Sequence, residues 1–143
     1  MADILYDFPI VAPASRVFRA VSTPEGLDAW WTLRSAGRPA IGSEYQLFFG
    51  PQYDWRAEIS RCEPNAEFEF LMTRSMLEWD QTRVGFHLAE QGDVTQVRFD
   101  HRGWAEPSDH FRTTAFCWAM YLRLLRRFVE HDEIVPYDRR LDV

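Results

Sequence analysis

The longest regular pattern in the chain lies between residues 107 and 131. Apolar residues recur there every three or four positions, which is typical of a helix with one buried face. This stripe consists of Phe111, Ala115, Trp118, Leu122, Leu125 and Val129. A second stripe beside it consists of Cys117, Tyr121, Leu124 and Phe128. So broad an apolar face needs a large partner surface, and we expect a sheet built from the preceding strands to supply it.

From residue 43 onward the apolar period changes to two, which is the period of half-buried strands. The alternation predicts strands within 43–50, 53–62, 67–72, 82–88 and 95–102, separated by turns rich in Gly, Pro and Asn. The predicted inward positions are Tyr45, Leu47, Phe49, Tyr53, Trp55, Ala57, Ile59, Phe68, Phe70, Met72, Thr82, Val84, Phe86, Leu88, Thr95, Val97, Phe99 and His101. The predicted outward positions, where we expect solvated cross-strand ion pairs, include Arg56, Arg61, Glu67, Glu69, Arg83 and Arg98.

The two ends of the chain complete the predicted order of elements. Residues 2–11 read as a first strand, and two short helices follow at 14–22 and 24–30. The charged tail from residue 132 to 143 is expected to be extended. Consecutive hairpins with one polar face indicate an antiparallel meander, so the fold class is α+β.

The composition of the chain argues against several classes of function but does not identify one. A length of 143 residues with 46% hydrophobic residues fits one domain with a real core. The net charge of −6 argues against non-specific binding to nucleic acid or to an anionic membrane. All the basic residues are arginine, which excludes Schiff-base chemistry. No signal peptide or membrane span is recognisable, so a cytoplasmic protein is expected. No metal-ligand spacing or phosphate loop occurs, and no cofactor is expected.

One set of segments and residues occurs in a characteristic order along the chain: Ala12-Pro13, Val17 to Val21, Thr23 to Leu27, Trp30-Trp31, Thr82, Val84, Phe86, Leu88, Gly92, Thr95, Val97, His101, Gly103, Trp104 and the long helix. Taken in this order, they resemble the START-like superfamily, also called SRPBCC or birch-pollen-allergen-like. The branch that looks most similar is the one named after the activator of the heat-shock protein 90 ATPase.

The resemblance covers nearly the whole chain and implies a single domain over residues 1–143 with a helix-grip fold. In that fold a curved antiparallel sheet of six to seven strands wraps around a long C-terminal helix, and two short helices follow the first strand. The resemblance also implies a cavity between sheet and helix that often holds an apolar ligand. The superfamily contains lipid carriers, hormone receptors, aromatase/cyclases and co-chaperone domains, so the fold alone does not choose a function.

A set of mostly aromatic residues is expected to line this cavity. The candidates are Trp30, Trp31, Trp55, Phe68, Phe70, Phe86, His101, Trp104, Trp118 and Met120. Each of them is also compatible with plain core packing, because most large apolar side chains simply fill the interior. His101 is the single catalytic candidate, since it closes an inward-facing run and could move a proton. A histidine with satisfied hydrogen bonds is the alternative.

Three functions remain open at this point. The first is binding of a small hydrophobic or aromatic molecule in the cavity. The second is an enzyme resembling the aromatase/cyclases, with His101 as acid/base and Tyr53 or Tyr121 as hydrogen-bond donors. The third is an interaction module associated with a chaperone. A homodimer is compatible with all three.

Overall fold

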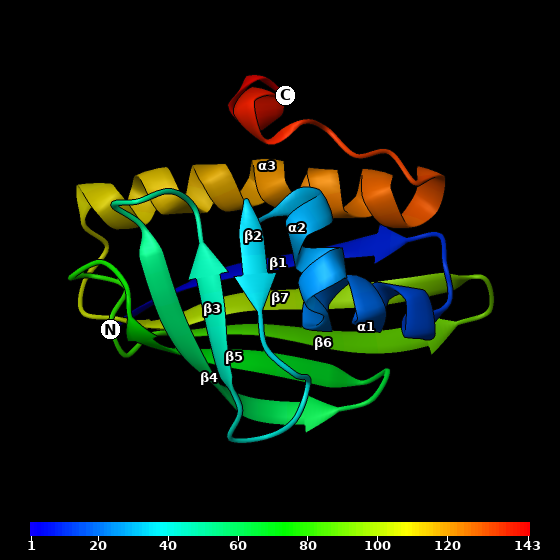
Figure 1. Ribbon diagram of the computed structural model, residues 1–143. Helices are drawn as coiled ribbons and strands as arrows, with labels where there is room; N and C mark the ends of the chain where they lie inside the picture. The colour runs from blue at the N-terminus through cyan, green and yellow to red at the C-terminus, as the bar shows by residue number, and fades with distance from the viewer.

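The computed structural model describes residues 1–143 and shows a curved antiparallel sheet that wraps around a long helix (Figure 1). The strands are β1 (Ala2–Ile10), β2 (Arg34–Ala36), β3 (Glu44–Phe48), β4 (Asp54–Glu63), β5 (Glu67–Arg74), β6 (Arg83–Gln91) and β7 (Val94–Trp104). The helices are α1 (Ala14–Ser22), α2 (Pro24–Trp30), α3 (Asp109–His131) and the 3-10 helix η1 (Tyr137–Asp142). The predicted helix-grip fold is confirmed.

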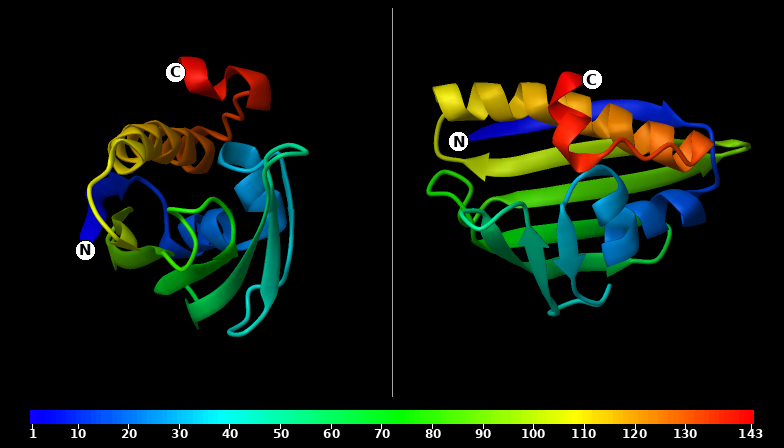
Figure 2. Two further views of the ribbon diagram at one scale, coloured as in Figure 1. Left: turned by 90° about the vertical axis from the view of Figure 1, so that its left-hand side faces the viewer. Right: turned by 45° about the horizontal axis from the view of Figure 1, so that its top comes forward.

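The strand order in the sheet is β1-β7-β6-β5-β4-β3-β2, so every pair except β1–β7 joins neighbours in sequence. The first and last long strands therefore lie side by side, while the three-residue β2 forms the other edge. Viewed nearly along α3, the sheet curves beneath that helix and η1 lies to one side of it (Figure 2). None of the helices combines the length and the apolar character that crossing a membrane requires.

The short helices α1 and α2 begin and pack as their local sequence dictates. The side chain of Thr23 caps α2 by accepting a hydrogen bond of 3.0 Å from the backbone N–H of Gly26. A Cβ atom at Gly26 would lie 2.5 Å from the carbonyl oxygen of Arg19 in α1. Because that oxygen belongs to the backbone, only glycine allows the two helices to approach this closely.

The predicted apolar stripe of α3 is confirmed. Trp118, Leu122, Leu125 and Val129 are all buried against the inner face of the sheet and the short helices. Ser108 caps the helix by accepting a hydrogen bond of 3.2 Å from the backbone N–H of Phe111. The sheet therefore packs against the face of α3 that the sequence pattern identifies as apolar.

The inward alternation of the strands is confirmed with one correction. Phe68, Phe70 and Met72 of β5 are fully buried, and the inward residues of β6 and β7 continue the same rows across the sheet. Tyr53, which was expected to face inward, precedes β4 and is 45% exposed. It lies in the turn after β3, where the two-residue alternation of the strand does not apply.

The C-terminal tail corrects a second expectation, because it is folded rather than extended. The buried Arg140 donates hydrogen bonds to the carbonyl oxygens of Val135 (3.0 Å), Thr32 (3.2 Å) and Asp28 (2.8 Å). Burial lowers the pKa of Arg140, and the neighbouring Tyr121, Tyr137 and Asp28 partly offset this effect. The guanidinium therefore fastens η1 to the end of α2.

We expect Arg140→Ala to lower the free energy of unfolding by about 2–4 kcal/mol, because it leaves the three carbonyl oxygens without their donor. Urea denaturation monitored by circular dichroism measures the change. The control is Arg139→Ala, which removes the same side chain at an exposed position of η1. Equal small effects of both substitutions would contradict the role assigned to Arg140.

Candidate functional site

The aromatic candidates lie together in the interior, and most of them pack on one another. All of the predicted cavity residues except Met120 are buried. Ring centroids lie 5.0 Å apart for Phe68 and Phe70, and 5.9 Å apart for Trp30 and Trp31. At such distances the rings fill the interior themselves and leave no room for a ligand between them. Met120 is half-buried and lies outside the core cluster.

A pocket of about 190 Å³ lies beside this core, between the end of α2, the first half of α3 and the turn that joins β5 to β6. It is lined by Trp31, Met76, Trp79, His110, Thr113, Thr114, Cys117, Trp118 and Tyr121. Of the predicted cavity residues, Trp31 and Trp118 line it, and so does Tyr121, which was a candidate hydrogen-bond donor of the enzyme hypothesis. Cys117 and Tyr121 were visible as the second apolar stripe of the helix, but nothing in the pattern marked Met76 or Trp79.

The walls of this pocket are largely apolar, and no arginine or carboxylate lines it. Burial, reinforced by Tyr137 and Cys117, raises the pKa of the Tyr121 phenol to about 12. Burial also raises the pKa of the Cys117 thiol. Both groups therefore stay protonated near neutral pH, and the pocket suits an uncharged ligand with apolar or aromatic surface.

A larger hollow of about 360 Å³ lies between α1, α2 and the end of α3, but its chemistry is different. Arg16, Arg19, Glu25 and Asp132 are among its lining residues, and only a minority of the lining is apolar. Arg16 already donates a hydrogen bond of 2.6 Å to the carbonyl oxygen of Val129. The smaller, aromatic pocket is therefore the better candidate for an apolar ligand.

His101 is fully buried on the inner face of β7, and protein groups satisfy both of its ring nitrogens. The indole N–H of Trp118 donates to Nδ1 over 3.1 Å, which places the proton of the neutral ring on Nε2. Nε2 then donates to Thr82 Oγ1 over 2.8 Å, and that hydroxyl donates to the carbonyl oxygen of Trp79 over 2.5 Å. Burial, and to a lesser extent His110, lowers the pKa of His101 from 6.5 to about 3.

This arrangement gives His101 a structural role. Trp79 and Trp118, which both contact His101, line the pocket, whereas His101 itself does not. A general acid or base must reach the reacting group directly or through one water molecule. Here both ring nitrogens of His101 are engaged by Trp118 and Thr82, and the interpretation as a hydrogen-bonded core histidine fits the geometry.

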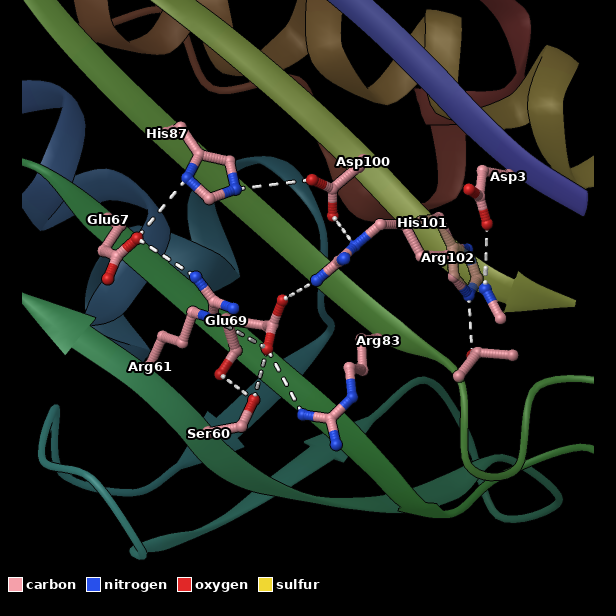
Figure 3. Close-up of polar contacts among 12 residues, drawn as sticks. Asp3, Ser60, Arg61, Glu67, Glu69, Arg83, His87, Asp100, His101 and Arg102 are labelled. Atoms are coloured by element: carbon pink, nitrogen blue, oxygen red, sulfur yellow. Dashed lines mark hydrogen bonds and ion pairs between the residues drawn. The ribbon is translucent and has the colours of Figure 1, made fainter.

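The outer face of the sheet carries a second cluster of polar side chains (Figure 3). Glu69 was expected to form solvated ion pairs there, but it is only 1% exposed. Its carboxylate lies 2.7 Å from Arg102, 3.4 Å from Arg83 and 3.7 Å from Arg61, and it accepts a hydrogen bond of 2.8 Å from Ser60. Burial alone would raise the pKa of Glu69, but the hydrogen bonds from Ser60 and Arg102 and the charges of the arginines hold it below its usual range.

Asp100 also belongs to this outer cluster, but its pKa is shifted in the direction opposite to that of Glu69. It lies 3.3 Å from both Arg102 and His87, and burial keeps its pKa above the usual range despite these neighbours. A Cβ atom at Gly85 would lie 2.8 Å from Asp100 Oδ1 and 3.4 Å from Glu69 Oε2. The absence of a side chain at Gly85 therefore makes room for two carboxylates on one face. The charged groups compensate one another, and we assign this cluster to stability.

Comparisons with known proteins agree with the fold. The family described as Activator of Hsp90 ATPase homolog 1-like protein matches residues 11–130. The Aha1 dimer from Colwellia psychrerythraea is 26% identical, with 93% of this chain and 99% of that chain covered and a TM-score of 0.84. A Staphylococcus saprophyticus protein is 20% identical over 94% of this chain and 96% of its own, with a TM-score of 0.77. DynU16, from the dynemicin biosynthetic locus, is 20% identical over 92% of this chain and 48% of its own, with a TM-score of 0.80. Among curated proteins none matches this sequence.

The depressed pKa of His101 predicts a pH-dependent stability. The unfolded chain takes up a proton at this histidine below about pH 6.5, whereas the folded chain does not do so until about pH 3. Stability should therefore fall as the pH decreases through this window, by up to about 1.4 kcal/mol per pH unit from this group. Urea denaturation between pH 4 and 7.5 should show a shallower pH slope for His101→Gln than for the wild type. His131→Gln, at a side chain that is 72% exposed, should leave the slope unchanged; equal slopes for all three proteins would refute the prediction.

Proposed function

The chain belongs to the family described as Activator of Hsp90 ATPase homolog 1-like protein, and on that premise we propose that it binds a small, uncharged apolar or aromatic molecule. The proposed site is the pocket between α3, the end of α2 and the β5–β6 turn. The observation that carries the proposal is the composition of its walls, which present aromatic rings and sulfur atoms without a fixed charge.

The lining residues provide both contact area and orientation. Trp79 and Trp118 pack on each other at 28° with centroids 6.1 Å apart, so together they form one aromatic wall against which a planar ligand can lie. Met76 and Cys117 add polarisable sulfur atoms, which pack well against aromatic rings. Thr113 and Thr114 supply hydroxyl groups that can bind one polar substituent of the ligand.

The proposal is limited to binding. DynU16 shares the fold at 20% identity, and that likeness does not identify a ligand or a reaction. An aromatase/cyclase-like activity with His101 as acid/base would require that histidine to border the pocket, and its ring nitrogens are occupied elsewhere. We therefore favour a carrier or receptor role over catalysis.

We expect the fluorescent, uncharged probe N-phenyl-1-naphthylamine to bind the wild-type protein and Cys117→Phe to weaken that binding at least about tenfold. The added ring would occupy a pocket of about 190 Å³. Fluorescence titration measures the affinity, and thermal unfolding confirms that the variant is folded. The matched control is Cys62→Phe, at the other free and half-buried cysteine, which lies on β4 away from the pocket. Unchanged affinity in Cys117→Phe would place the probe elsewhere.

We also propose that the chain forms a homodimer through the solvent face of α3. The likeness to the Aha1 dimer from Colwellia psychrerythraea supports the oligomeric state. The surface is suggested by Phe116, which is 78% exposed, and by the half-buried Met120 one turn away. Antiparallel pairing of two copies of α3 would place the acidic Asp109 at one end opposite the exposed Arg127 of the second copy.

We expect Phe116→Asp to shift the wild-type dimer toward monomer by at least about tenfold in dissociation constant, because it places a charge in an apolar contact. Sedimentation equilibrium over a range of concentrations measures the shift. Leu5→Asp, on the outer face of β1 and 65% exposed, is the control. A wild-type protein that stays monomeric would overturn the dimer, and a dimer insensitive to Phe116→Asp would move the interface off this face.

A further inference from the structure

The proposed pocket is small for the ligands it would take. Its volume of about 190 Å³ lies below the roughly 300–1,000 Å³ typical of small-molecule sites. A ligand of more than about two fused rings would extend beyond this volume unless one wall moves. Trp31 and Trp118 are held by the aromatic core, with centroids 5.2 Å apart, so neither is free to withdraw. The remaining wall is the turn between β5 and β6, residues 75–82, which contributes Met76.

This turn is closed on itself by its own hydrogen bonds. The backbone N–H and the hydroxyl of Ser75 donate to Asp80 Oδ1 over 2.6 and 2.8 Å. The backbone N–H groups of Trp79 and Asp80 both donate to the carbonyl oxygen of Met76 over 2.9 Å. Trp79 is buried among Trp55, His101 and other rings, so it anchors one end of the turn in the core. The residues just before that anchor are less buried: Met76 is half-buried, and Leu77 and Glu78 are exposed.

One side chain ties this segment to α3. Glu78 Oε1 accepts a hydrogen bond of 2.5 Å from the hydroxyl of Ser108, and Glu78 Oε2 lies 3.3 Å from His110 Nδ1. These are the only polar side-chain contacts between the turn and α3. Ser108 is also the N-cap of α3, so the carboxylate lies at the positive end of the helix dipole. In Figure 1 the turn accordingly lies beside the start of α3.

Apolar packing of this segment is limited to Met76, which lies against the edge of the core. Leu77, next to Glu78, is 91% exposed, and Met76 is only partly buried. Glu78 and His110 are themselves 39% and 30% exposed at the side chain, so water can replace their contact at modest cost. The segment is therefore held closed by a contact that is specific in geometry and weak enough to open.

We propose that Glu78 is a positioning residue that latches the Met76 wall onto the N-terminus of α3 and thereby sets the size of ligand that the pocket admits. The proposal rests on the proposed binding function, since a latch regulates access only if the pocket takes a ligand. Small planar molecules fit with the latch closed. Larger ones bind after Glu78 leaves Ser108 and His110 and Met76 withdraws from α3.

The test compares the wild type with Glu78→Ala and uses two uncharged probes, 1-naphthol and the larger N-phenyl-1-naphthylamine. We expect Glu78→Ala to raise the association rate of the larger probe about fivefold in stopped-flow fluorescence, and to leave that of 1-naphthol within about twofold. Glu106→Ala removes the same side chain from an exposed position just before α3 and should change neither rate. Equal rates in all three proteins would overturn the latch and leave the binding function standing.

Hydrogen exchange provides a readout that needs no ligand. The backbone amides of Ser75, Trp79 and Asp80 are hydrogen-bonded inside the turn, and we expect them to exchange about fivefold faster in Glu78→Ala than in the wild type or in Glu106→Ala. Unchanged exchange would overturn the latch whatever the probes do. Faster exchange in a protein that binds neither probe would refute the binding function and, with it, control of access by Glu78.

Discussion

The fold depends on the packing of one side chain, Trp118, against three segments that are distant in sequence. The centroid of its ring lies 5.2 Å from that of Trp31 at the end of α2, 4.7 Å from that of Phe99 in β7 and 6.1 Å from that of Trp79 in the β5–β6 turn. Its indole N–H also donates to His101. Because these contacts converge on the middle of α3, the helix cannot shift along the sheet without breaking all of them. The pocket exists where this packing ends, and its shape follows from the same ring.

The two faces of the sheet satisfy buried polar groups in opposite ways. On the inner face, burial lowers the pKa of His101 and keeps its ring neutral, and each ring nitrogen has an uncharged hydrogen-bond partner. On the outer face, Glu69 stays ionised because Arg102 and its neighbours surround the carboxylate. The uncharged groups around His101 suit an apolar ligand, whereas Glu69 and Asp100 on the outer face are already paired with arginines. The electrostatics thus direct the binding hypothesis toward the inner pocket.

Sequence periodicity predicted the elements well, since it reports which side of a strand or helix is buried. It located the strands of the meander, both short helices and the apolar face of α3. It failed where burial comes from contacts that are remote in sequence. Arg140 is buried by Thr32 and Asp28, more than one hundred residues away, so a charged tail appeared extended. Glu69 lies on the outward phase as expected, but alternation cannot show that arginines from neighbouring strands close over it.

The site was harder to predict for a different physical reason. A pattern shows that Phe68, Phe70 and Phe86 face inward, but not whether their rings leave space between them. In this protein they fill the interior, and the unfilled volume lies beside a turn. The shape of that turn depends on the Ser75–Asp80 hydrogen bonds and on Gln81, whose φ of 69° is left-handed although glutamine does not favour that region. A ligand pocket in such a fold is therefore set by the few residues that interrupt the regular pattern, and these are the residues that periodicity leaves unmarked.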